Sequence, residues 1–164
     1  MVKPLGASLY VPANHKNLSR IANGDKLEQA RSLIFCLEDA VGERDLSWAL
    51  FNLSVVLAHM RPQAAAERFV RVRNPEVLAR VLAMPGAEKL DGFVLPKVTR
   101  HNFETYFRLV RDTGHDLMIT EPQGGRTPRP IRVSQASKGG YTRPQGGRDE
   151  QHVSPRRGGQ GHGQ

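Results

Sequence analysis

Short apolar runs alternate with longer stretches of helical periodicity across the first 120 residues. The apolar runs predict five β-strands, over residues 7–12, 31–39, 67–75, 90–98 and 116–120. The intervening stretches predict four helices, over residues 14–24, 43–60, 75–86 and 100–114. In the second of these helices apolar side chains recur every three or four residues, which places them on one face. They are Leu46, Leu50, Leu53, Leu57 and Met60.

This alternation, with short links, predicts an α/β fold with a parallel sheet and crossover helices. Two architectures share the pattern: an open, doubly wound sheet and a (β/α)₈ barrel. The loop after the first strand, "VPANHKN" (11–17), contains neither the Gly-x-Gly-x-x-Gly nor the Gly-Lys-Ser/Thr fingerprint of nucleotide-binding loops. That absence favours the barrel modestly, but periodicity alone leaves both architectures open.

The pattern changes abruptly after Thr120. Residues 121–164 contain 10 of the 16 Gly, 5 of the 11 Pro and only five apolar side chains. Such a segment cannot bury enough surface to offset the entropy of ordering it. We therefore expect residues 1–120 to form the folded domain and residues 121–164 a disordered basic tail. The tail holds eight Lys or Arg against three Asp or Glu, so it carries most of the net charge of +8.

Cysteine content and the length of the apolar runs constrain the cellular setting. Cys36 is the only cysteine, so an intramolecular disulfide and a cysteine-based zinc site are both excluded. No run approaches the roughly 18 apolar residues of a membrane span. The N-terminal segment "MVKPLGASLYVP" lacks the apolar stretch and cleavage site of a signal peptide. We expect a cytoplasmic protein with no membrane partner.

Polar side chains gather where the predicted strands end. They are Asn14 and His15 after the first strand, Glu38 and Asp39 at the second, Arg71 to Asn74 at the third, and Lys97 at the fourth. In both architectures the carboxyl ends of the strands form the functional edge. Each residue also has a structural interpretation, because carboxylates cap helices and an Arg can simply pair with them. Recurrence at four consecutive strand ends favours a functional site.

The residue types at this edge suggest a chemistry. Adjacent carboxylates can hold a hard divalent cation directly or through its waters, and an Arg can clamp a substrate carboxylate. A metal that polarises a carbonyl beside that anchor stabilises an enolate, as a metal-dependent carbon–carbon lyase or aldolase requires. Lys97 raises the alternative of a Schiff-base aldolase, which needs a desolvated Lys. We rank the metal route above it.

Three segments carry a resemblance to a known family. "SLYVPANHKNLSRIANGDKLEQARSLIFCLEDAV", "FVRVRNP" and "LDGFVLPKV" resemble the HpcH/HpaI aldolase and citrate lyase beta-subunit family over about residues 7–120. The resemblance implies a (β/α)₈ TIM barrel, of which this chain holds the first four to five βα units. It also implies Mg²⁺-dependent cleavage or formation of carbon–carbon bonds in oxoacid or acyl-CoA substrates, with CoA as part of the substrate, and a homo-oligomer in full-length relatives.

Site residues follow from the same resemblance. Arg71 matches the Arg that binds the substrate carboxylate or carbonyl, although Arg73 departs from the usual Val-Arg-Val-Asn and leaves the register open by two residues. Glu38 and Asp39 match the acidic pair near the metal and its waters, which makes these two and Arg71 the catalytic candidates. His15 lies in the loop that approaches the substrate, and Lys97 completes the predicted substrate-binding set.

The family's direct metal ligands come later in the chain, where the resemblance fails. Glu121 follows the fifth strand and is the candidate for the first ligand, but Pro and Gly follow it where a helix should start. Asp149 is the only Asp of the tail, and its surroundings share nothing with the second metal motif. Because a closed barrel needs about 250 residues, we expect a truncated enzyme of low or no activity.

Three interpretations of residues 121–164 compete. We favour an out-of-frame reading of the gene, because the resemblance stops in the middle of a strand. A flexible extension is the second interpretation. The third is a basic tail that binds RNA or another acidic polymer, based on "PQGGR" at 122–126 and 144–148 and on "RRGGQGHGQ". This would make the protein a non-enzymatic binding protein, but aromatic residues are scarce there and we do not expect a nucleic-acid partner.

Overall fold

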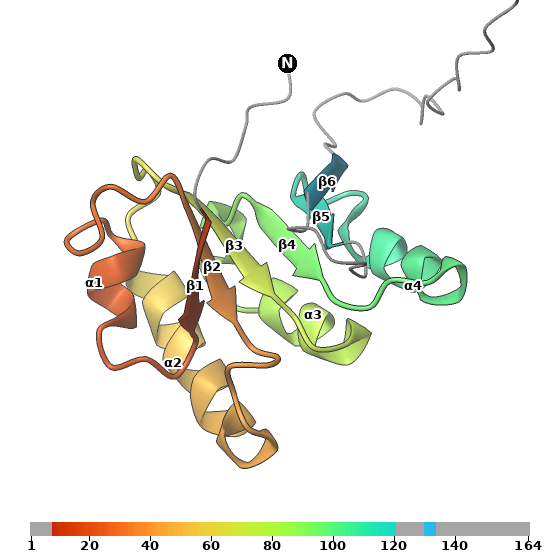
Figure 1. Cartoon of the computed structure of the whole chain (residues 1–164), viewed down its shortest axis with the longest axis horizontal. Helices are drawn as coiled ribbons and strands as arrows, with labels where there is room; N and C mark the ends of the chain where they lie inside the picture. Colours follow the sequence, from red (N-terminus) through yellow and green to blue (C-terminus); the bar gives the residue numbers. More distant parts are fainter. Residues whose placement is uncertain (1–7, 121–129, 134–164) are drawn as a thin grey trace, which may run out of the picture.

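A computed structural model describes residues 8–120 and 130–133. Its centre is a sheet of five parallel strands, which run from red β1 to blue-green β5 in Figure 1. The strands are β1 (Ser8–Pro12), β2 (Ser32–Cys36), β3 (Glu67–Arg71), β4 (Gly92–Leu95) and β5 (Asp116–Thr120). All five coincide with predicted strands, since each apolar run is long enough for a strand and too short for a helix.

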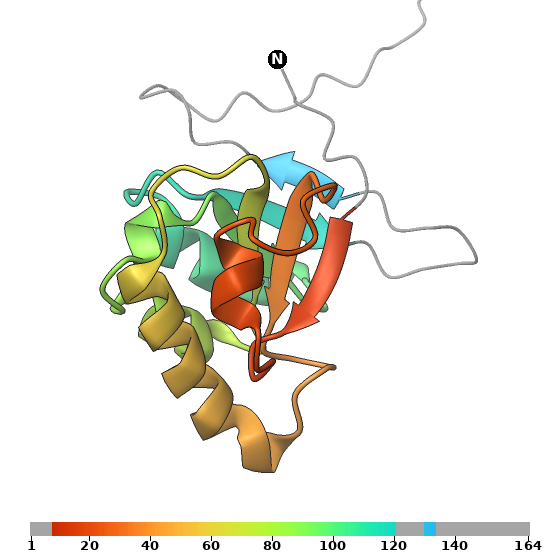
Figure 2. The same cartoon turned by 90° about the vertical axis from the view of Figure 1, so that its left-hand side faces the viewer.

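Helical segments connect the parallel strands. They are α1 (Leu18–Ala22), η1 (Glu43–Asp45), α2 (Leu46–His59), α3 (Pro75–Leu82), η2 (Ala87–Lys89) and α4 (Arg100–Val110). Buried side chains of all four α-helices share one hydrophobic cluster with one face of the sheet, and Figures 1 and 2 show the helices gathered along that face. The predicted apolar face of α2 is confirmed, because Leu50, Leu53 and Leu57 are at most 2% exposed.

Strand order decides between the two architectures. The strands neighbour one another in sequence order, β1-β2-β3-β4-β5, and every pair among them is parallel. A doubly wound sheet reverses direction at a switch point and places helices on both faces. A sequential order with the helices on one face is the arrangement of a barrel wall. The partial TIM-barrel prediction is therefore confirmed.

The opposite face of the sheet carries a second, smaller core. Ile34, Phe69, Val94 and Met118 come from four neighbouring strands and are at most 1% exposed. In a barrel this face points inward, where side chains from the strands stack in layers. Strands β2 to β5 are thus buried on both faces, which explains their continuous apolar runs.

A sixth strand, β6 (Pro130–Val133), pairs antiparallel with β5. The hydrophobic pattern does not predict it, because it lies within the Gly- and Pro-rich segment. An uncovered β5 edge would leave a row of unpaired backbone groups, and β6 supplies partners for them. The remainder of 121–164, including Glu121 and Asp149, lies outside the described residues.

The predicted start of the first helix is wrong. The pattern predicts a helix from Asn14, but turns occupy the chain after β1 and α1 begins only at Leu18. Among the described residues, no helix has the length and apolar character needed to cross a membrane.

Candidate functional site at the carboxyl edge of the sheet

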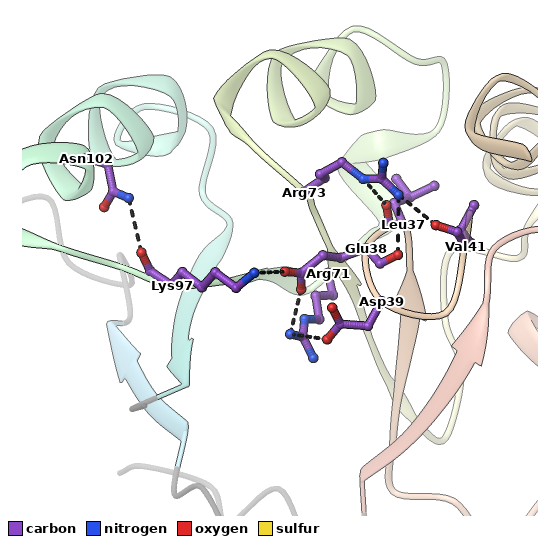
Figure 3. A network of polar contacts seen from close by, with 8 residues as sticks. All are labelled: Leu37, Glu38, Asp39, Val41, Arg71, Arg73, Lys97 and Asn102. Atoms are coloured by element: carbon purple, nitrogen blue, oxygen red, sulfur yellow. Dashed lines mark hydrogen bonds and ion pairs between the residues drawn. The ribbon is translucent and has the colours of Figure 1, made fainter. Parts of the chain in front are cut away.

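Residues that follow β2, β3 and β4 meet at the carboxyl edge of the sheet. Arg71 is the last residue of β3 and pairs in register with Cys36 of β2 and Val94 of β4. Glu38 and Asp39 follow the end of β2, and Lys97 follows the end of β4. Because parallel neighbours end at the same edge, residues from three segments that are far apart in sequence become neighbours here (Figure 3).

Arg71 lies between the two carboxylates. Its Nη2 is 2.5 Å from Glu38 Oε2 and 2.9 Å from Asp39 Oδ2. The guanidinium also lies over the ring of Tyr10, with Cζ 5.7 Å from the ring centroid. The Glu38 side chain is only 9% exposed, whereas that of Asp39 is 69% exposed. Arg71 thus holds one buried carboxylate and one that reaches solvent.

Two opposing effects set the charge state of Arg71. Burial of the guanidinium disfavours its charged form, but the negative charges of Glu38 and Asp39 outweigh this and raise the pKa of Arg71 above its ordinary value. The side chain is therefore a permanent cation. Its Nε is buried, and no described residue accepts a hydrogen bond from it.

Arg73 has a different task. Its Nη2 donates to the carbonyl oxygens of Val41 (2.6 Å) and Glu38 (3.4 Å), and its Nε donates to that of Leu37 (3.3 Å). These bonds fix the turn that carries the acidic pair (Figure 3). The two Arg residues therefore differ in their contacts: Arg71 contacts the carboxylates, and Arg73 contacts the backbone behind them. Which of them matches the family's substrate-binding Arg stays a prediction.

Lys97 occupies an unusual backbone conformation at the rim. Its φ is +45°, in the left-handed region that L-residues rarely adopt. The Asn102 side-chain amide donates to its carbonyl oxygen at 3.2 Å, while its Nζ lies 3.9 Å from Glu38 Oε1. The side chain is 88% exposed. A Schiff-base Lys needs desolvation, so the geometry of the described residues does not support that alternative.

A cavity of about 460 Å³ opens beside the ion-pair cluster formed by Glu38, Asp39, Arg71 and Lys97. Its walls come from the β2, β3 and β4 ends and from α4. The lining residues are Glu38, Asp39, Arg73, Asn74, Pro75, Pro96, Lys97, Asn102 and Tyr106. A space of this size is typical of small-molecule sites. Glu38, Asp39 and Lys97 belong both to its wall and to the ion-pair cluster.

Two of the lining residues escape sequence reasoning. Asn102 and Tyr106 lie on the first turns of α4, within a segment that the pattern identifies only as a helix. Thr99 and Asn102 form a reciprocal capping box, in which each side chain bonds the other residue's backbone N–H. That spacing is a readable signal for the helix start. Tyr106, four residues after Asn102, then falls on the same helix face.

His15 is placed at the same edge but contacts other groups. Its Nδ1 accepts from the backbone N–H of Asn17 at 3.1 Å, and the Asn52 side chain donates to the carbonyl oxygens of Ala13 and His15. Among the described residues, no hydrogen bond or ion pair joins His15 to Arg71, Glu38, Asp39 or Lys97. Its predicted substrate contact stays a prediction.

The described residues fit only part of a magnesium site. Glu38 and Asp39 supply two adjacent carboxylates of the hard-oxygen type, but both form ion pairs with Arg71. No group of three or more His, Cys, Asp or Glu able to hold a metal ion exists within 8–120 and 130–133. The pair is suited to bind the water shell of a cation, and the metal role predicted for Glu121 falls outside the described residues.

The fold is part of a barrel wall, and its carboxyl edge holds an Arg that pairs with two adjacent carboxylates. A model of carbon–carbon bond lyases of the TIM-barrel fold matches residues 1–121, and the chain belongs to this family. A comparison with curated proteins finds no match to this chain.

Proposed function

We propose that this site serves Mg²⁺-dependent cleavage or formation of a carbon–carbon bond in an oxoacid or acyl-CoA substrate, as in HpcH/HpaI aldolases and citrate lyase beta subunits. Membership of the carbon–carbon lyase family supports the reaction class. The observation that carries the substrate class is Arg71, a permanent cation at the carboxyl edge whose side chain is 20% exposed.

Arg71 binds the oxygen that becomes negative. In the cleavage direction, the substrate hydroxyl loses its proton to water and becomes the carbonyl of one fragment as the carbon–carbon bond breaks. The electrons of that bond move onto the carbonyl of the other fragment, which leaves as an enolate and takes up a proton from water. A fixed guanidinium stabilises that charge without reorganising, which is the main source of electrostatic catalysis. Glu38 and Asp39 hold the guanidinium in place, and Arg73 holds the turn that carries them.

The acidic pair also supports the magnesium dependence. Glu38 and Asp39 would accept hydrogen bonds from the water shell of the ion, and a bound Mg²⁺ supplies a Lewis acid that polarises the carbonyl. Lys97, 3.9 Å from Glu38, adds a second positive charge at the rim that attracts an anionic substrate.

Enolate formation can be tested without demanding full turnover. Pyruvate in D₂O exchanges its methyl protons when an enzyme forms the enolate, and NMR records the loss of the methyl signal. With Mg²⁺ and the full chain we expect exchange above the buffer rate, and chelation of the metal should abolish the excess. Arg71→Lys should lower it at least about tenfold, because the ammonium cannot reproduce the fixed fork of donors.

A matched Arg variant controls for loss of charge elsewhere. Arg20 lies in the last turn of α1 and is exposed, so Arg20→Lys should leave exchange unchanged. Exchange at the buffer rate with every metal concentration would remove the proposal. Exchange that survives chelation would remove its magnesium part and leave the enolate chemistry.

A further inference from the structure

We infer that the cavity beside the ion-pair cluster is a specificity subsite in which Tyr106 donates a hydrogen bond to a neutral acceptor, such as an ester or ketone carbonyl, on the non-reacting end of the substrate. The inference deepens the proposed function and rests on it. It concerns the wall of α4 and the β3 end rather than the ion pair of Arg71.

Tyr106 is a buried residue with an unused donor. It lines the cavity and is only 2% exposed. Within the described part of the chain its hydroxyl has no hydrogen-bond partner, and it is not among the polar atoms shut off from solvent. Because Tyr106 lines the cavity, a group bound there lies beside this side chain. Buried Tyr hydroxyl groups usually have a partner, so a bound group would satisfy this one.

The hydroxyl is a donor at neutral pH. Burial and the negative charges of Glu38 and Glu76 raise the pKa of Tyr106 above its ordinary value. Its proton is retained, and the neighbouring carboxylates disfavour a negative charge next to the ring. An oxygen acceptor without charge meets both conditions.

The remaining walls also favour a neutral group. Two carboxylates, Glu38 and Asp39, face two cations, Arg73 and Lys97, so the lining has no net charge. The Arg73 guanidinium is already committed to the Leu37, Glu38 and Val41 carbonyls. The Asn102 amide donates one N–H to the Lys97 carbonyl oxygen and accepts from the Thr99 N–H. Among the donors of this wall, Tyr106 is the most deeply buried, whereas Asn74 and Asn102 are half-buried.

The cavity adjoins the proposed reaction centre. Glu38 pairs with Arg71 and also lines the cavity, so a short substrate bound at Arg71 extends into it. An oxoacid of five carbons or more has the length for its far end to enter the space next to Tyr106. The subsite would select among oxoacids by the functional group at their non-reacting end.

Calorimetric titration of the full chain, with Mg²⁺ present, tests the inference with three oxoacids that share the same reacting end. The 5-methyl ester of 2-oxoglutarate carries a neutral acceptor, 2-oxoheptanoate has the same length without one, and 2-oxoglutarate carries a charge instead. Wild-type protein should bind the ester about five- to tenfold more tightly than the heptanoate, as expected for one net hydrogen bond. Tyr106→Phe should reduce that ratio to about one and leave heptanoate affinity unchanged.

Ser54→Ala is the matched control, since it also deletes one hydroxyl but on the exposed surface of α2, where Ser54 donates to Phe51. It should keep the ester preference. Equal binding of ester and heptanoate by wild type, or a preference that survives Tyr106→Phe, would overturn the subsite while oxoacid binding stands. If wild type binds 2-oxoglutarate most tightly and Tyr106→Phe loses that preference, the subsite binds a charged group, and the proposed neutral acceptor is wrong. If no oxoacid binds, the proposed function falls and the subsite with it.

Discussion

At the scale of single residues, one cation organises the candidate site. Arg71 contacts a buried carboxylate, an exposed carboxylate and an aromatic ring. Removing a partner from a buried ion pair costs more than the pair contributes, because the remaining charge stays desolvated. Arg71 is therefore expected to matter for stability as well as for the proposed chemistry, and the two roles can be separated.

Arg71→Met should lower the free energy of unfolding by about 2–3 kcal/mol, below the full penalty of a buried pair because Asp39 reaches solvent. The double variant Arg71→Met, Glu38→Gln should recover a large part of the loss, since it also removes the stranded charge. Urea denaturation of the wild type, the two single variants and the double variant completes the double-mutant cycle. A double variant as unstable as the sum of the singles would show that the pair is not coupled.

Tyr106 gives a pH dependence with a definite sign. Its pKa is raised in the folded protein, so the unfolded chain loses this proton first as the pH rises. The contribution of Tyr106 is fully present below about pH 10, the ordinary Tyr value, and is lost as the pH rises through the higher folded value. Unfolding free energy should fall above about pH 10, and Tyr106→Phe should reduce that fall. Urea titration at several alkaline pH values measures how the unfolding free energy changes with pH. If this dependence is the same in Tyr106→Phe as in the wild type, the prediction is wrong.

The Arg residues of β3 and its extension show what sequence reasoning can and cannot resolve. The motif "ERFVRVRNP" predicts a strand with Arg at its carboxyl end, and that much holds. Arg68, Arg71 and Arg73 nevertheless differ: Arg68 donates to the carbonyls of Arg61, Pro62 and Lys89 at the other end of the sheet. Their partners come from segments distant in sequence, so the spacing of the three Arg residues could not predict which groups each one contacts.

At the scale of elements, strand positions were predictable and helix starts less so. The apolar runs place the centre of each parallel strand correctly, because burial on both faces leaves few polar positions. The start of α1 was misplaced because Asn14 has the right residue type for a cap, whereas the turns that precede α1 depend on contacts with α2. The Asn52 side chain of α2 binds the Ala13 and His15 carbonyls.

The turn between α3 and η2 packs closely against the end of α2. Gly86 has φ +89°, and a Cβ there would lie 2.0 Å from the Leu57 carbonyl oxygen. Lys89 Nζ donates to the Leu57 and Ala58 carbonyls at the same place. The glycine is thus required both for backbone conformation and for the close approach of two helices.

Gly86→Ala should therefore destabilise the protein by about 3–4 kcal/mol, through left-handed strain and displaced backbone together. Gly24→Ala is the matched control: its φ is +78°, but a Cβ there meets nothing within 4 Å. It should cost only about 1–2 kcal/mol, from strain alone. Thermal and urea unfolding of both variants would measure the difference, and equal losses would refute the steric part.

At the scale of the whole molecule, the sheet has two cores of different origin. The helix-covered face was predictable from helical periodicity, whereas the opposite face was not. Its four members, Ile34, Phe69, Val94 and Met118, are apolar residues in strands whose alternation is hidden by burial on both sides. Only the sequential strand order identifies that face as the inner layer of a barrel wall.

Two phenylalanines test whether the inner face is a true core. Phe35 on the helix-covered face and Phe69 on the inner face are both 0% exposed and lie on adjacent strands. Because cost follows lost contacts and residual cavity, Phe69→Ala and Phe35→Ala should each lower the unfolding free energy by about 3–5 kcal/mol. Urea denaturation of both variants would decide the point. A loss under about 1 kcal/mol for Phe69→Ala, with the full loss for Phe35→Ala, would mean that the inner layer contributes little and that the helix-covered core alone holds the sheet.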